Sequence, residues 1–129
     1  MILGGFLITA SCSNEHIEQI KQSVTDLVHD GLGNYDCIIV IPEVGCTGCI
    51  ATVEQYFIEN VNNTRYKFIF TNFLSRKALK YRLGGDENLK RQNVFIDEYD
   101  LIFNPEYEDK IYPHILTVKN GKITNVKVF

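Results

Sequence analysis

Two cysteines separated by two residues carry the clearest chemical signal in this sequence. They lie in the stretch Gly45-Cys46-Thr47-Gly48-Cys49, and the residues that follow have the apolar spacing of a helix. Cysteines at positions i and i+3 in the first turn of a helix share one face, so their sulfurs can close a small disulfide ring. The spacing therefore predicts a thiol–disulfide redox pair.

The two cysteines have different expected roles. A helix N-terminus presents unpaired N–H groups and a partial positive charge, which stabilise a thiolate. Cys46 is therefore the expected nucleophile. Cys49, one turn further on, is the expected resolving thiol, which attacks the mixed disulfide that Cys46 forms with a partner protein. Such an exchange uses no cofactor, and its partners are protein thiols and disulfides.

A pair of this kind is also half of a zinc site. Zinc takes four ligands, and the sequence holds no second Cys-x-x-Cys and no histidine pair to complete the set. We therefore expect no metal at Cys46 and Cys49.

Strands and helices alternate around the pair. Residues 35–41 are β-branched and nearly continuous in apolar character, which predicts a strand buried on both faces. Residues 49–61 have apolar side chains on one side of a helix, and residues 66–71 predict a second strand. A strand, a helix and a strand of this length predict a βαβ unit with parallel strands.

The remaining segments complete an α/β pattern. Residues 14–30 predict an amphipathic helix, and Ser75 is expected to cap a helix that ends near Leu83. Residues 94–96 predict a short strand. Residues 99–111 contain Asn-Pro and four acids, and we expect an irregular excursion there.

A β-hairpin is expected at the end of the chain. Asn120-Gly121 supplies the positive φ angles of a two-residue type I′ turn. The expected cross-strand pairs are Lys119 with Lys122, Val118 with Ile123, Thr117 with Thr124, Leu116 with Asn125, and Ile115 with Val126. Neither face of this hairpin would be the clean apolar surface that obligate dimers bury, so we expect a monomer.

The composition limits the function classes. A chain of 129 residues with 45% hydrophobic residues suits one compact domain. The formal charge of −3 arises from interspersed acids and bases, so the chain has no electrostatic footprint for nucleic acid.

The first residues resemble a targeting segment. Residues 1–10 are apolar and uncharged, too short to span a bilayer but suited to the apolar region of a signal peptide. Small residues precede Cys12 and polar residues follow it, which resembles the lipobox of a bacterial lipoprotein. The resemblance implies that residues 1–12 are a signal segment, that lipidated Cys12 tethers the protein to a membrane, and that residues 13–129 form the single domain.

A buried strand, a Cys-x-x-Cys pair that opens a helix, a second strand, and Tyr112-Pro113 before a terminal hairpin together resemble the thioredoxin fold. The resemblance implies a three-layer α/β fold with a central mixed sheet. It also implies that Pro113 is a cis-proline beside the cysteine pair, where its backbone contacts a bound peptide. Tyr112, Thr47 and Gly48 would belong to the same peptide-binding surface.

The sequence departs from this family in several ways. Val44-Gly45 replaces the tryptophan before the pair, and the first strand lacks the family's buried acid, which leaves Glu43 as a weak substitute. The closing C-terminal helix is also expected to be absent. Together with the lipobox, the resemblance implies an enzyme, a thiol–disulfide oxidoreductase on the periplasmic side of the bacterial cell envelope. The alternative is a thioredoxin-like module that binds partners without catalysis.

Overall fold

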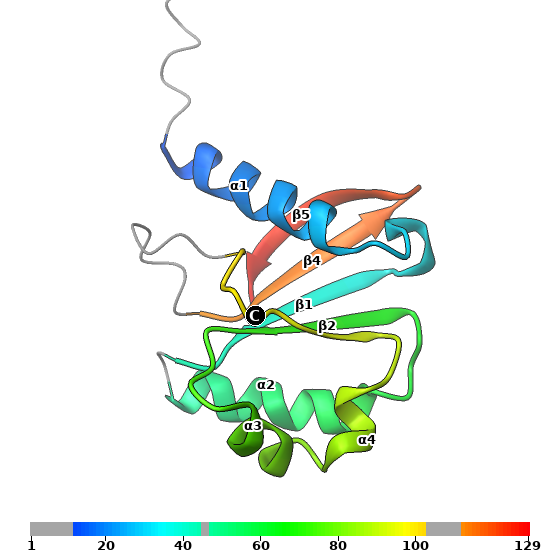
Figure 1. The fold of residues 1–129 in the computed structure, drawn as a ribbon. Coiled ribbons are helices and arrows are strands. Elements are labelled where there is room, and N and C mark those ends of the chain that lie inside the picture. The colour runs from blue at the N-terminus through cyan, green and yellow to red at the C-terminus, as the bar shows by residue number, and fades with distance from the viewer. Residues whose placement is uncertain (1–11, 45–46, 103–111) are drawn as a thin grey trace, which may run out of the picture.

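A computed structural model shows a mixed α/β arrangement around one sheet (Figure 1). It describes residues 12–44, 47–102 and 112–129, with side chains from Ile17 onward. Within these ranges the sheet has five strands, in the order β3-β2-β1-β4-β5. The expected α/β class and the central mixed sheet are confirmed.

The strands lie close to their expected positions. They are β1 (Cys37–Pro42), β2 (Tyr66–Thr71), β3 (Val94–Ile96), β4 (His114–Lys119) and β5 (Lys122–Val128). The helices are α1 (Cys12–Leu27), the 3-10 helix η2 (Leu32–Asn34), α2 (Thr47–Asn60), α3 (Arg76–Arg82) and α4 (Asp86–Leu89). Ser75 caps α3 as expected, because its side-chain oxygen accepts the Ala78 N–H at 3.2 Å. The short helix α4 was not assigned from the sequence.

β1 is the central strand of the sheet. It pairs in parallel with β2 and in antiparallel with β4, and β2 pairs in parallel with β3. The parallel pairing of β1 and β2 confirms the βαβ unit around α2. All four residues from Ile38 to Ile41 have 0% exposed surface, as expected for a strand covered on both faces.

Helices cover both faces of the sheet, so the described part of the chain has three layers (Figure 1). α1 lies on one face and packs Ile20 and Val24 against Ile38 and Val40 of β1. α2, α3 and α4 lie on the other face, where Phe57 packs against Ile39 and Ile41. Alternate residues of β1 therefore serve two separate cores.

The terminal hairpin has the expected turn but a different register. Asn120 and Gly121 have φ angles of 54° and 75°, and the pairs Lys119–Lys122 and Val118–Ile123 are confirmed. An irregularity between Thr117 and Val118 then shifts the pairing by one residue. The expected pairs Thr117–Thr124, Leu116–Asn125 and Ile115–Val126 are wrong, and the observed pairs are Thr117–Asn125, Leu116–Val126 and Ile115–Lys127.

Burial explains the shifted register. Ile123 and Val126 are three residues apart, so a regular strand would point them to opposite faces. One extra residue in β5, as in a β-bulge, lets both side chains join the core under α1, beside Leu116 and Val118. A register predicted from the turn alone does not include the stabilisation that comes from burying Val126.

The register gives a first test. Val126→Ala is expected to lower the free energy of unfolding by about 1 kcal/mol, because Val126 packs partly buried against the core. The matched variant Thr124→Ala removes an exposed side chain and is expected to change it by less than about 0.5 kcal/mol. Urea denaturation of both variants measures the difference, and equal losses would contradict the shifted register.

Candidate functional site

The cysteine motif lies where β1 leads into α2. β1 ends at Pro42, and the Glu43 N–H donates to the Thr71 carbonyl at 2.9 Å, which continues the link to β2. α2 begins at Thr47, two residues earlier than the sequence indicated. Cys46 lies outside the described residues, whereas Cys49 lies in the first turn of α2.

Cys49 is disulfide-bonded. The side chain that supplies its partner sulfur is not among those the structure describes. Thr47 and Gly48 are exposed, and Cys49 is half-buried beside them. A Cβ added at Gly48 would meet no atom of the described residues within 4 Å, so none of them covers the first turn at this point.

The first turn of α2 has the electrostatics that favour a thiolate. α2 is 14 residues long, and no acidic residue lies in its first turn. The unpaired N–H groups there and the partial positive charge of the helix end are therefore not offset by a neighbouring carboxylate in that turn.

Aromatic packing holds α2 in place on the sheet. Ile50, Val53 and Phe57 form its buried face. The Phe57 ring meets the Phe68 and Phe70 rings of β2 edge-on, with centroids 4.9 and 5.1 Å apart. Burying such a side chain stabilises the fold by about 2 kcal/mol, so the start of α2 is fixed relative to β1 and β2.

The sheet register brings Pro113 to the same edge. His114 pairs with Val40, so Pro113 lies at the carboxyl end of β1, from which the chain enters α2. Pro113 is buried, and its carbonyl accepts the Phe129 N–H at 2.8 Å. Tyr112, just before it, is 37% exposed. The structure thus places these two residues and the first turn of α2 at one edge of the sheet.

Sequence reasoning underestimated Glu43. Its side chain is only 2% exposed, and its Oε1 accepts a hydrogen bond from Nη2 of Arg82 on α3. Nη2 and Nε of Arg82 also lie 3.3 Å from Oε2 of Glu54 on α2. The second oxygen of Glu43, Oε2, is buried and has no hydrogen-bond partner among the described residues. The single guanidinium group of Arg82 therefore contacts two carboxyl groups, those of Glu43 and Glu54.

Burial and, after it, the neighbouring Glu54 side chain raise the pKa of Glu43 to about 8, against the opposing effect of Arg82. The desolvation penalty of the Glu43 carboxylate here exceeds the stabilisation that it receives from the shared Arg82 guanidinium. Glu43 is therefore mainly neutral at pH 7. Such a perturbed carboxyl beside a motif of two cysteines marks a functional-site candidate.

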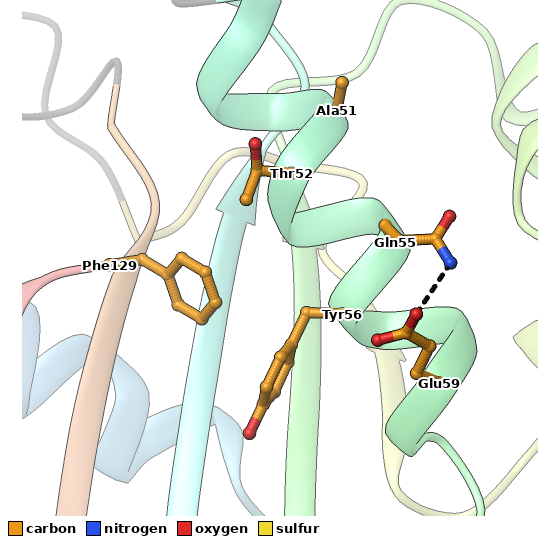
Figure 2. A pocket seen from close by; sticks show the side chains of 6 residues that line it. All are labelled: Ala51, Thr52, Gln55, Tyr56, Glu59 and Phe129. Atoms are coloured by element: carbon orange, nitrogen blue, oxygen red, sulfur yellow. Dashed lines mark hydrogen bonds between the residues drawn. The ribbon is translucent and has the colours of Figure 1, made fainter.

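Two cavities flank α2. The first measures about 410 Å³ and is lined by Glu43, Thr47, Ile50, Ala51, Glu54 and Arg82. The second, about 470 Å³, lies between α2 and the last residue of the chain (Figure 2). Figure 2 shows Phe129 facing Tyr56 across it, with ring centroids 5.3 Å apart. The first cavity contains the buried carboxyl group of Glu43 beside the partly buried Glu54 and the exposed Arg82, and the second is lined mainly by exposed side chains.

Asp97 organises the loop that follows β3, which sequence reasoning also missed. Its side chain is buried and accepts hydrogen bonds from Thr71 Oγ1 at 2.9 Å, from the Leu101 N–H at 2.9 Å and from the Ile102 N–H at 3.3 Å. The bonds fix residues 97–102 beside the ends of β2 and β3. Of the expected excursion at residues 99–111, residues 103–111 lie outside the described part of the chain.

Cys37 is not a second thiol of this site. It is free and half-buried at the start of β1, at the opposite end of the strand from the motif. Burial raises the pKa of its thiol, and Asp36 raises it further. At neutral pH Cys37 is therefore a weaker nucleophile than a cysteine at a helix N-terminus.

No known family model, no curated protein and no solved structure matches this chain. The function is therefore argued from the site itself. Among the described residues, no group of three or more histidine, cysteine, aspartate or glutamate side chains is placed to hold a metal ion. Within the same residues, no helix combines the length and the apolar character that crossing a bilayer requires.

The raised pKa of Glu43 gives a second test. Between pH 4.5 and about 8, the folded protein keeps a proton on Glu43, whereas the unfolded chain, in which Glu43 has the ordinary pKa of 4.5, releases it. The free energy of unfolding of the disulfide form is therefore expected to fall as the pH rises from 4.5 to about 8. Glu43→Gln cannot ionise and is expected to lack this fall, whereas Glu59→Gln, at an exposed position on α2, is expected to keep it. Unfolding curves across this range measure the difference, and parallel profiles for wild type and Glu43→Gln would contradict the assignment.

Proposed function

We propose that this protein is a thiol–disulfide oxidoreductase that exchanges disulfides with partner proteins through Cys46 and Cys49. The observation that carries the proposal is Cys49 itself, a disulfide-bonded cysteine in the open first turn of a helix. A cysteine three residues before it in the sequence is the natural partner for that disulfide.

The chemistry follows from the two positions. The Cys46 thiolate attacks a disulfide of the partner, forms a mixed disulfide and releases one partner thiolate, which takes up a proton. Cys49 then loses its proton and attacks the Cys46 sulfur. The Cys46–Cys49 disulfide forms, the second partner thiolate leaves, and two electrons have passed to the partner. The reverse sequence oxidises a partner dithiol.

The arrangement of the elements supports a thioredoxin-like fold. The mixed sheet, the helix that starts beside the motif, and the hairpin that follows Pro113 agree with the features that the sequence shares with that family. On this interpretation Thr47, Gly48, Tyr112 and Pro113 form the surface on which the partner polypeptide lies.

Exposed apolar side chains at the same edge support a protein partner. They follow the carboxyl ends of β1, β2 and β3 or precede β4, and we call them the apolar rim: Val44, Leu74, Tyr99, Leu101 and Tyr112. Their exposed fractions run from 37% for Tyr112 to 95% for Leu74. Apolar residues gathered around an accessible site are typical of a surface that binds another protein.

The location in the cell is part of the same proposal. The lipobox-like pattern supports a tether through Cys12 on the periplasmic side of the bacterial envelope, and residues 1–11 lie outside the described residues. The helix α1 begins at Cys12, so a lipid attached to Cys12 would be attached to the first residue of a helix.

The exchange mechanism gives the third test. Cys49→Ser is expected to accumulate a mixed disulfide with a disulfide-containing probe protein such as insulin, because the resolving step is removed. Cys46→Ser is expected to form no adduct, and Cys37→Ser is expected to behave as the wild type. Non-reducing gels and mass spectrometry detect the adduct. Adducts carried by Cys49 in the Cys46→Ser variant would reverse the two roles, and no adduct in either variant would favour the non-catalytic module.

The apolar rim gives the fourth test. Leu74→Asp is expected to raise the KM for insulin several-fold, since it places a charge on the proposed contact surface, and to leave the rate with glutathione unchanged. The control is Tyr81→Asp, because Tyr81 is 87% exposed on α3 and is not part of the rim. If both variants changed the KM for insulin equally, the apolar rim would not be part of the partner-binding surface.

A further inference from the structure

The first cavity lies beside the first turn of α2, which carries Cys49 of the proposed redox pair. Two of its lining residues, Thr47 and Ile50, immediately follow Cys46 and Cys49 in the chain. Consecutive Cα atoms are about 3.8 Å apart, and Thr47, which lines the cavity, follows Cys46 directly in the chain. A partner cysteine joined to Cys46 is therefore only one or two residue lengths from the cavity. A side chain that neighbours the partner's reactive cysteine can therefore reach it.

The walls of this cavity suit a long cationic side chain. Ile50 and Ala51 provide an apolar wall that would contact methylene groups, and Glu43 and Glu54 provide two carboxyl groups. Arg82 is the single cation among the lining residues, and its side chain is 46% exposed, so it does not seal the carboxyl groups from solvent. With both carboxyl groups ionised, the cavity carries a net charge of −1.

The unpartnered oxygen of Glu43 is free to accept a hydrogen bond when the carboxyl group is ionised. Its side chain is only 2% exposed, yet Oε2 has no hydrogen-bond partner among the described residues. Leaving such an atom unsatisfied opposes the folded state. An ammonium or guanidinium group from outside would supply both a hydrogen-bond donor and the missing positive charge.

We infer that this cavity binds the side chain of a lysine or arginine next to the reactive cysteine of the partner protein. The inference rests on the proposed function, since it names the class of partner sequence that the redox pair receives. Partners with a basic residue beside the cysteine react faster than partners with a neutral or acidic residue there.

Proton release accompanies the binding. The groups that face the cavity are Glu43 after β1, Glu54 on α2 and Arg82 on α3. Glu43 is neutral in the empty cavity at pH 7 because its pKa is raised to about 8, and an arriving cation favours its ionised form. The affinity for a cation therefore rises with pH until Glu43 is ionised in the free protein. Cys49 does not titrate in the disulfide form, so it does not contribute to this dependence.

The test uses cysteine-free probes first. Two short peptides, identical except that one has lysine where the other has norleucine, are each titrated into the disulfide form of the full chain. Binding is measured from the shifts of the NMR amide signals of Thr47, Ile50 and Ala51. The lysine peptide is expected to bind about tenfold more tightly at pH 8, a difference of about 1.4 kcal/mol. Glu43→Gln and Glu54→Gln are expected to abolish the preference, and Glu59→Gln, an exposed acid on the same helix, is expected to keep it.

A second set of peptides, each with one cysteine thiol beside the lysine or norleucine, measures the rate of exchange with the same variants. Equal binding of the two cysteine-free peptides, or a preference kept by both Glu43→Gln and Glu54→Gln, would overturn the cavity assignment. Exchange without any lysine preference would overturn it too, while leaving the oxidoreductase in place. A lysine preference in binding with no exchange by any thiol peptide would instead overturn the proposed function.

Discussion

The parallel pairing of β1 with β2 is the constraint on which the rest of this structure depends. Parallel neighbours require a crossover between them, and α2 is that crossover. The chain has four residues between Pro42 and Thr47 in which to leave the buried strand and start the helix. The cysteine motif begins in this passage and ends in the first turn of α2, so its position at the edge of the sheet follows from the pairing rather than from any contact of its own.

The same pairing explains why the first turn of α2 is both accessible and held in place. Phe57 anchors α2 against Phe68 and Phe70, and the Glu43 N–H ties the start of the passage to Thr71. The first turn itself carries no bulky side chain over Gly48. A thiol at this point meets solvent and partners without disturbing the core, and the free end of the helix favours its ionised form. Rigidity behind the site and access in front of it are the conditions for repeated disulfide exchange.

Periodicity and turn chemistry predicted most of the fold. β2 and the Ser75 cap were found at their observed residues, because the first is rich in aromatic and β-branched residues and the second depends on local hydrogen bonding. The register of β5 was wrong because the burial of Val126 under α1 is a tertiary effect that the turn does not encode. The positions of Cys46 and residues 103–111 stay as predictions.

The candidate site was predicted only in part. The spacing of the cysteines pointed to Cys49, but nothing local in the sequence shows that Glu43, after a strand, would be buried between α2 and α3 with Arg82 and Glu54. That cluster joins residues up to 39 positions apart, and such contacts depend on the whole topology. Alternation offers the one available signal, since Ile39, Ile41 and Glu43 share a face of the extended chain.

The central claim is that Cys46 and Cys49 form a reversible two-electron couple. Equilibration of the protein with a graded series of reduced and oxidised dithiothreitol, followed by alkylation and mass spectrometry, measures it directly. The account predicts that both thiols become alkylated together, in one transition in which the reduced-to-oxidised ratio changes tenfold for each shift of about 30 mV. Cys37 should be alkylated only slowly and at a rate independent of potential. A motif that stays oxidised throughout, or a Cys46 that titrates without Cys49, would contradict it.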